Sequence, residues 1–398
     1  MNLLQFKVPN KIKSILKLQP TYVICFLLIC FSDFWVYHAK PIIPLYYFYL
    51  FSLLYIPVFL LHQKILVFSK AQIFSLICTL YTFSVFLYGN NDWQYLIHTG
   101  TAISCFIIAT MYLRNINVKK IFSISKWLLL LTSFYISLET YWRLSHPLLS
   151  REENLSDIES GSFYIYKINS FMISDSNAIG LMTLVLLFFA FYMYKYVNKS
   201  KFYKFMIFIF AILTILSISR AAIIAMIISY GAIKAVDIIK KSIKIYKIKQ
   251  KLTINSIILL LAFPIFLILF SIILIKLFQD ASFGTKISLI TDTINFVNKV
   301  PLEKFLFGVG TSLDVANHLF GRYPHNIVLT YLSWFGLIGT TLIYLYWYQI
   351  IKETNFKGIL VLLPQILAGI SYTFPGLHLF YCTIALMWAF EKNKGLNN

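Results

Sequence analysis

Arg220 lies in the segment ILSISRAAIIAM, as a charged residue between two otherwise apolar stretches. Ala222, Ala225, Ser229 and Ala232 follow at helical spacing and predict a stripe of small residues against which another helix packs closely. On a helical wheel Arg220 projects roughly opposite that stripe. A guanidinium placed there could hold a phosphate or pyrophosphate through paired hydrogen bonds. Alternatively, it reaches from a helix end to the phosphates of lipids.

His325 is the second residue whose position suggests chemistry. It begins the apolar stretch HNIVLTYLSWFGLIG, in which Gly336 and Gly339 return to nearly the same face of a continuous helix. Glycines there would let a neighbouring helix approach closely and fix the orientation of the histidine. A histidine accepts a proton near neutral pH. A histidine that only anchors a helix end at the membrane edge has the same pattern.

Two hydrophilic segments, 143–171 and 277–325, contain further candidate residues. Gly308 and Gly310 form a GxG turn whose backbone N–H groups could face a ligand, or which only turns the chain. Basic side chains in these segments could add positive charge to an anion site or be solvated; they are Arg143, Arg151, Lys167, Lys286, Lys304 and Arg322.

Ionisable and sulfur-containing side chains also occur inside or beside the apolar stretches. Asp33 and Glu139 lie near the ends of such stretches, where an acid is a functional candidate by default. The cysteines lack metal-ligand spacing and are expected to be small buried hydrophobic residues; they are Cys25, Cys30, Cys78, Cys105 and Cys382. Because phosphate-binding and dinucleotide-binding loops are also missing, the sequence predicts neither a metal nor another cofactor.

The composition indicates what kind of protein positions these residues. Of 398 residues, 59% are hydrophobic and only 13% are charged, which is about half the charged fraction of a soluble domain. One water-soluble core cannot bury so many apolar side chains, so soluble enzymes, coiled coils, disordered chains and nucleic-acid-binding proteins are excluded. We expect a single all-α integral membrane domain over residues 1–398.

About twelve stretches are long enough to cross a bilayer as helices. They cover 20–37, 41–61, 71–89, 94–113, 121–142, 172–194, 203–218, 221–237, 253–276, 326–348, 357–374 and 376–391. Residues 203–237 could form one helix, but a break at 217–220 keeps the lysine-rich stretch 234–251 on the same side as the other basic loops. The prediction is two helices joined by a tight turn before Arg220.

Basic residues are distributed asymmetrically across this topology. Twenty-five of the 35 Lys and Arg residues, but only three of the 15 acidic residues, fall on the side that holds both termini. Basic residues concentrate on the cytoplasmic side of membrane proteins, so both termini are expected there. The net charge of +20 is thus a topology signal and indicates no nucleic-acid partner. The segments 143–171 and 277–325 fall on the external side.

The order of these segments resembles the O-antigen polymerase and O-antigen ligase superfamily of bacterial inner membranes. The similar segments are SRAA at 219–222, FLFGVG at 305–310, HN at 325–326 with GLIG at 336–339, and ISDSNAIG around Asn177. The resemblance is strongest over 205–345. It implies a GT-C-like arrangement of about a dozen helices, cytoplasmic termini and a large late periplasmic loop, here 277–325.

The resemblance implies an inverting, metal-independent transfer of a glycan from undecaprenyl pyrophosphate at the periplasmic face. Arg220 would neutralise the pyrophosphate leaving group, and His325 would orient or deprotonate the acceptor hydroxyl. Further substrate-binding residues would be Lys286, Arg322, Arg151, Gly308, Gly310 and Asn177. The family commonly has an arginine early in the late loop; Lys286 supplies charge there without the bidentate fork.

The implied partners are lipid-linked glycans as donor and acceptor, the bilayer and a chain-length regulator. A polymerase extends another lipid-linked repeat unit, whereas a ligase transfers the glycan to lipid A-core. The segment 277–325 is short for an enzyme that accommodates lipopolysaccharide, and ISDSN is similar to a polymerase segment, so a polymerase is favoured. A lipid-linked oligosaccharide flippase or other exporter is a third possibility, but it should have two similar halves and charged central helices.

Overall fold

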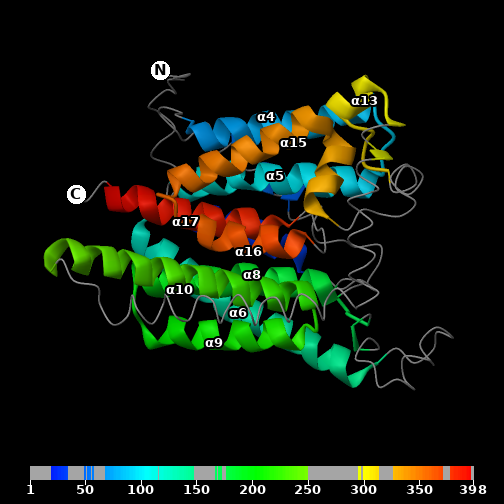
Figure 1. The fold of residues 1–398 in the computed structure, drawn as a ribbon. Helices are drawn as coiled ribbons and strands as arrows, with labels where there is room; N and C mark the ends of the chain where they lie inside the picture. The colour runs from blue at the N-terminus through cyan, green and yellow to red at the C-terminus, as the bar shows by residue number, and fades with distance from the viewer. Residues whose placement is uncertain are drawn as a thin grey trace.

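The computed structural model describes residues 19–34, 49–50, 52–54, 56–57, 68–114, 116–147, 166–167, 169–172, 176–249, 295–296, 299–312, 326–370 and 377–395. Over these residues every regular element is a helix, as the composition predicts. The helices lie side by side in a bundle that runs from α4 and α15 at one edge, through α5, α17 and α8, to α9 at the other (Figure 1).

The helix boundaries follow the predicted apolar stretches closely. The elements are α1 (Gln19–Cys30), η2 (Phe31–Asp33), α4 (Lys70–Ser84), η3 (Val85–Leu87), α5 (Trp93–Leu113), α6 (Val118–Ser145), α8 (Ser176–Tyr192), η5 (Met193–Val197), α9 (Lys201–Leu216), α10 (Arg220–Lys249), α13 (Leu302–Phe307), α15 (Ile327–Glu353), α16 (Ile359–Gly369) and α17 (His378–Gly395). The predicted span 253–276 and most of 41–61 lie outside the described residues.

Five described helices are long and apolar enough to cross a membrane. They are Trp93–Leu113, Val118–Ser145, Ser176–Val197, Arg220–Ile238 and Ile327–Glu353. The apolar helices Pro20–Asp33 and Ile359–Gly369 are shorter. The total of twelve spans and the large periplasmic loop stay predictions. All five cysteines are buried, as predicted.

The outward face of α6 shows why the bundle suits a lipid environment. Large apolar side chains recur every three or four residues and are exposed; they are Trp127, Leu131, Phe134, Leu138 and Tyr141. In water this stripe would be costly, whereas hydrocarbon solvates it. By contrast, 89% of the apolar stretch in α8 is buried, against 22% in α10. Thus α8 is a central helix and α10 a peripheral one.

Side-chain caps mark where several helices begin. Ser69 and Gln72 form a reciprocal capping box at the start of α4. Asp92 accepts a hydrogen bond from the N–H of Gln94 at the start of α5, and Asn117 accepts one from the N–H of Lys120 in α6. These caps satisfy N–H groups that have no partner within the helix.

Ion pairs and hydrogen bonds join several helices at the end of the bundle where α17 ends, here called the basic end. Glu353 of α15 accepts a 2.9 Å hydrogen bond from the N–H of Ala71 in α4, and Glu391 of α17 pairs with Lys357. Basic side chains at these helix ends are Lys70, Arg114, Lys119, Lys120, Lys195, Lys234, Lys352, Lys357 and Lys392. The described basic loops therefore lie at one end of the bundle, in agreement with the predicted asymmetry of Lys and Arg residues.

The helix after His325 is not continuous, contrary to the prediction that Gly336 and Gly339 share its face with the histidine. Within α15, Gly336 has φ +63°, and the helix bends sharply there. A Cβ on Gly336 would lie 2.4 Å from the N atom of Gly308. Gly308 itself has φ +92°. Two backbones therefore cross at these glycines, and the bend, not a smooth helical face, sets the direction of the chain.

Gly339 allows the close approach of a neighbouring helix that the sequence predicts. A Cβ there would lie 2.4 Å from the ring of Tyr81, so the missing side chain lets α4 approach α15. The hydroxyl of Tyr81 donates a 2.9 Å hydrogen bond to the carbonyl of Phe335 beside the bend. This bond satisfies a carbonyl at the break in the helix.

We predict that Gly336→Ala destabilises the protein by at least about 1–3 kcal/mol, because an alanine is strained at positive φ and meets the backbone of Gly308. Thermal unfolding of the detergent-purified protein measures this loss. Gly231→Ala is the matched control: a Cβ added at Gly231, in α10, would have nothing within 4 Å, so helix propensity predicts equal or slightly greater stability. Equal unfolding temperatures for both variants would contradict the crossing.

Candidate functional site

The turn between α9 and α10 is the local structure that presents Arg220, and it lies where the sequence predicts it. Ser217 ends α9, and Ile218 adopts φ +57°, so the chain reverses within three residues. Ser219 precedes α10 and caps its first turn: its carbonyl accepts from the N–H of Ile223, and its Oγ accepts from the N–H of Ala222 at 3.4 Å. Arg220 is thus the first residue of α10.

The small-residue stripe of α10 is buried as predicted over most of its length. Ala222, Ala225 and Ser229 are buried, whereas Ala232 is exposed. Arg220 is exposed and lies off the packed face. The prediction is wrong only for Ala232; the next residue, Ile233, still packs against the core, so the buried face of α10 departs from the stripe there.

The start of α8 packs directly against this turn. Oδ1 of Asn177 accepts a 2.9 Å hydrogen bond from Oγ of Ser219. One turn later, a Cβ on Gly180 would lie 2.8 Å from the Cβ atoms of Ser219 and Ala222. Both contacts come from the segment ISDSNAIG, because positions 177 and 180 share a helix face. Two segments about forty residues apart in sequence therefore pack against each other, and the exposed Arg220 directly follows Ser219 at this contact.

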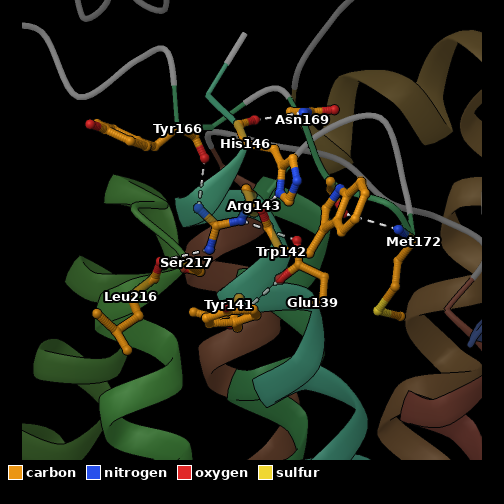
Figure 2. Close-up of polar contacts among 12 residues, drawn as sticks. Glu139, Tyr141, Trp142, Arg143, His146, Tyr166, Asn169, Met172, Leu216 and Ser217 are labelled. Carbon is orange, nitrogen blue, oxygen red and sulfur yellow. Dashed lines mark hydrogen bonds and ion pairs between the residues drawn. The ribbon is translucent and has the colours of Figure 1, made fainter.

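A buried arginine holds this turn from the other side (Figure 2). Arg143 is at the end of α6, and its side chain has no exposed surface. Its Nε donates to Oε1 of Glu139 at 3.1 Å, Nη1 to the carbonyl of Tyr166 at 2.8 Å, and Nη2 to the carbonyl of Leu216 at 2.7 Å. Each nitrogen of the guanidinium donates to a protein oxygen, so Arg143 is part of the framework.

The position of Arg143 at the last turn of α9 has an electrostatic reason. The final carbonyls of a helix lack intrahelical partners and carry partial negative charge. A cation that donates to the carbonyl of Leu216 neutralises that end, and Glu139 balances the buried charge. From the sequence, Glu139 is a candidate functional acid, whereas Arg143 is expected among the charges of the hydrophilic segment 143–171. Their four-residue spacing on one helix is the signal that could have paired them.

His146, just after α6, is oriented by contacts with Trp142 and with the hydroxyl of Ser145. Its ring stacks on that of Trp142 with centroids 3.9 Å apart, and its Nδ1 lies 3.0 Å from the carbonyl of Trp142. Because a carbonyl only accepts, Nδ1 carries the hydrogen and Nε2 has the lone pair in the neutral ring. The carbonyl of His146 accepts a 2.6 Å hydrogen bond from Asn169.

The glycines at 308 and 310 lie at the same end of the bundle but pack elsewhere. The N–H groups of Gly308, Val309 and Gly310 donate to the carbonyls of Lys304, Ser333 and Trp334, at 2.8, 2.8 and 3.3 Å. These amides are therefore committed to the protein backbone. The turn docks on the bend of α15 and on residues 90–92, not on the α9–α10 turn (Figure 1).

Several predicted residues lie outside the described part of the chain: Arg151, Lys286, Arg322 and His325. Asn326, the neighbour of His325, caps α15 by accepting from the N–H groups of Val328 and Leu329, and it donates to the carbonyl of Ile370 at 3.2 Å. Among the described residues, no three His, Cys, Asp or Glu side chains gather as a metal site.

Comparison with known proteins adds no relative. No protein-family model matches the chain, and no curated protein is significantly similar to it.

We predict that Glu139→Gln and Arg143→Met each destabilise the protein by about 3–5 kcal/mol, because each leaves the other partner buried without its counter-charge. The double variant should lose less than the sum of the two, which thermal unfolding in detergent measures as a coupling. Arg220→Met, an arginine at the same end that is exposed, is the control and should cost less than about 1 kcal/mol. Additive losses would contradict a direct pair.

Proposed function

We propose that this protein is an O-antigen polymerase that joins undecaprenyl-pyrophosphate-linked repeat units at the periplasmic face of the bacterial inner membrane. The observation that carries the proposal is the contact between the segments 177–180 and 217–222. Both belong to the resemblance, and they meet through Asn177, Gly180 and Ser219 at the end of the bundle opposite the basic end.

The end of the bundle beside this contact suits an anionic leaving group. Helices α8 and α10 both begin there, and helix N-termini favour anions through their N–H groups and dipoles. Arg220 is exposed at the first position of α10 and supplies a planar set of donors. In the proposed reaction these groups stabilise the negative charge that develops on the pyrophosphate as the glycosidic bond breaks.

Arg143 has a different part in the proposal from Arg220. It is enclosed and bonded to three oxygens, so it holds the turn and does not contact substrate. The proposed proton acceptor for the attacking hydroxyl is His325, which directly precedes the N-cap residue Asn326 of α15. Lys286, Arg151 and Arg322 are proposed to add positive charge around the diphosphate, from the segments 143–171 and 277–325.

The first test compares lipopolysaccharide from a strain that lacks this gene with that of the parent strain on a gel. A core carrying one repeat unit is expected, because transfer to the core continues while polymerisation is lost. Bare core with long glycan still on undecaprenyl pyrophosphate would instead identify a ligase. Bare core with lipid-linked repeat units held at the cytoplasmic face would identify an exporter.

We predict that Arg220→Ala, expressed in the deletion strain, abolishes the polymer ladder although the protein reaches the membrane at normal levels. Arg220→Lys should restore only short chains, since lysine supplies charge without the bidentate fork. Lys304→Ala is the matched control, because Lys304 is an exposed basic residue at the same end; it should leave the ladder unchanged. A normal ladder from Arg220→Ala would rule out Arg220 as the phosphate-binding residue.

A further inference from the structure

A second polar cluster lies inside the bundle, where η2, α5 and α17 meet. Oδ1 of Asp33 is 2.7 Å from Nδ1 of His378, and Nε2 of His378 is 2.9 Å from Oγ1 of Thr101. The side chains of His378 and Asp33 are 0% and 3% exposed. We propose that Asp33, His378 and Thr101 form an intramembrane proton-binding site, separate from the surface around Arg220.

One half of the site is fixed in both protonation states. Oδ2 of Asp33 accepts a 2.8 Å hydrogen bond from the N–H of Leu379, which holds the carboxylate at the start of α17. The other oxygen faces Nδ1 of His378, and a carboxylate only accepts. Nδ1 therefore carries a hydrogen throughout, and the proton that binds or leaves is the one on Nε2.

Thr101 makes both states possible. Its hydroxyl has one hydrogen and three acceptors within reach: the carbonyl of Ile97 at 2.6 Å, the carbonyl of His98 at 3.1 Å, and Nε2 of His378 at 2.9 Å. When the imidazole is neutral, the hydroxyl donates to Nε2. When Nε2 binds a proton, the hydroxyl turns to the carbonyl of Ile97 and accepts from Nε2–H. Neither state leaves a buried polar atom of His378 without a partner.

A structural cap on α17 would not need the histidine. The carboxylate of Asp33 already satisfies the N–H of Leu379, and an apolar residue at 378 would avoid burying an ionisable group. With the proton bound, Asp33 and His378 form a neutral ion pair; without it, one negative charge stays in the bundle. The favourable attraction within the pair and the cost of removing both charges from water act in opposite directions.

Other titratable side chains surround the pair. The rings of His98 in α5 and of Tyr49 each lie 6.3 Å from that of His378. The thiols of Cys30, Cys105 and Cys382, from α1, α5 and α17, also interact electrostatically with the pair. Since two imidazolium rings at that distance repel, a proton on His378 disfavours one on His98. The two histidines therefore exchange one proton with water, on Nε2 of His378, and no other bond changes.

Nitrogen NMR of the full-length protein in lipid nanodiscs, with ¹⁵N-labelled histidine, tests this proposal. The signal of His378 is assigned as the one that disappears in His378→Gln. We expect its Nε2 to gain a proton reversibly as the pH is lowered across the range in which the protein stays folded. One unchanged protonation state across that range would overturn the proposal.

Variants of the two partners sharpen the test. Thr101→Val removes the hydroxyl's bond in both states, and the charge-assisted bond from Nε2–H is the stronger of the two. Asp33→Asn removes the counter-charge. Both variants should therefore move the titration midpoint to lower pH, the latter corresponding to about tenfold weaker proton binding or more. Thr101→Ser keeps the hydroxyl and should titrate like the parent protein, as should Thr99→Val, a buried threonine two residues away on the same helix. An unchanged midpoint in Thr101→Val would rule out Thr101 as part of the proton-binding site.

Discussion

Hydrocarbon offers no hydrogen-bonding partner, and this constraint governs how the backbone groups at the helix ends of the bundle are satisfied. Along the helices the backbone bonds to itself and the side chains that meet lipid are apolar, as on α6. Where helices end or bend, the partners come from other segments. Arg143 bonds the last carbonyl of α9, Asp33 bonds the first turn of α17, and Tyr81 bonds the carbonyl at the bend of α15. Tertiary contacts therefore concentrate polar chemistry at helix ends.

The two arginines near the α9–α10 turn show how burial separates framework from function. Arg143 and Arg220 have the same side chain and lie close to the same three-residue turn. Arg143 is enclosed by Glu139 and two carbonyls, so its charge stabilises the turn. Arg220 starts a helix and is exposed. Only the exposed one is placed to meet a ligand from outside, and the proposed polymerase chemistry depends on that difference.

The features that the sequence predicts correctly are those set by the order and spacing of residues along the chain. The break before Arg220 followed from the position of the lysines alone, and the buried stripe from Ala222 to Ser229 followed from helical spacing. The prediction of a continuous helix is wrong at Gly336, because an apolar stretch does not indicate a bend that arises when a distant segment crosses it. Gly308 and Gly336 can pack backbone against backbone only because neither has a side chain, although they lie in different segments of the chain.

The sequence by itself determined the class of the protein, the approximate helix limits and the asymmetry of charge, since each depends on hydropathy and length summed along the chain. The tertiary structure alone decided which polar residues meet. Nothing in the spacing of Asp33, Thr101 and His378, which come from three distant helices, indicates that they form one hydrogen-bonded chain. The same holds for Asn177 and Ser219. Helix packing makes these pairs, and packing depends on the shapes of both surfaces at once, which no single stretch of sequence contains.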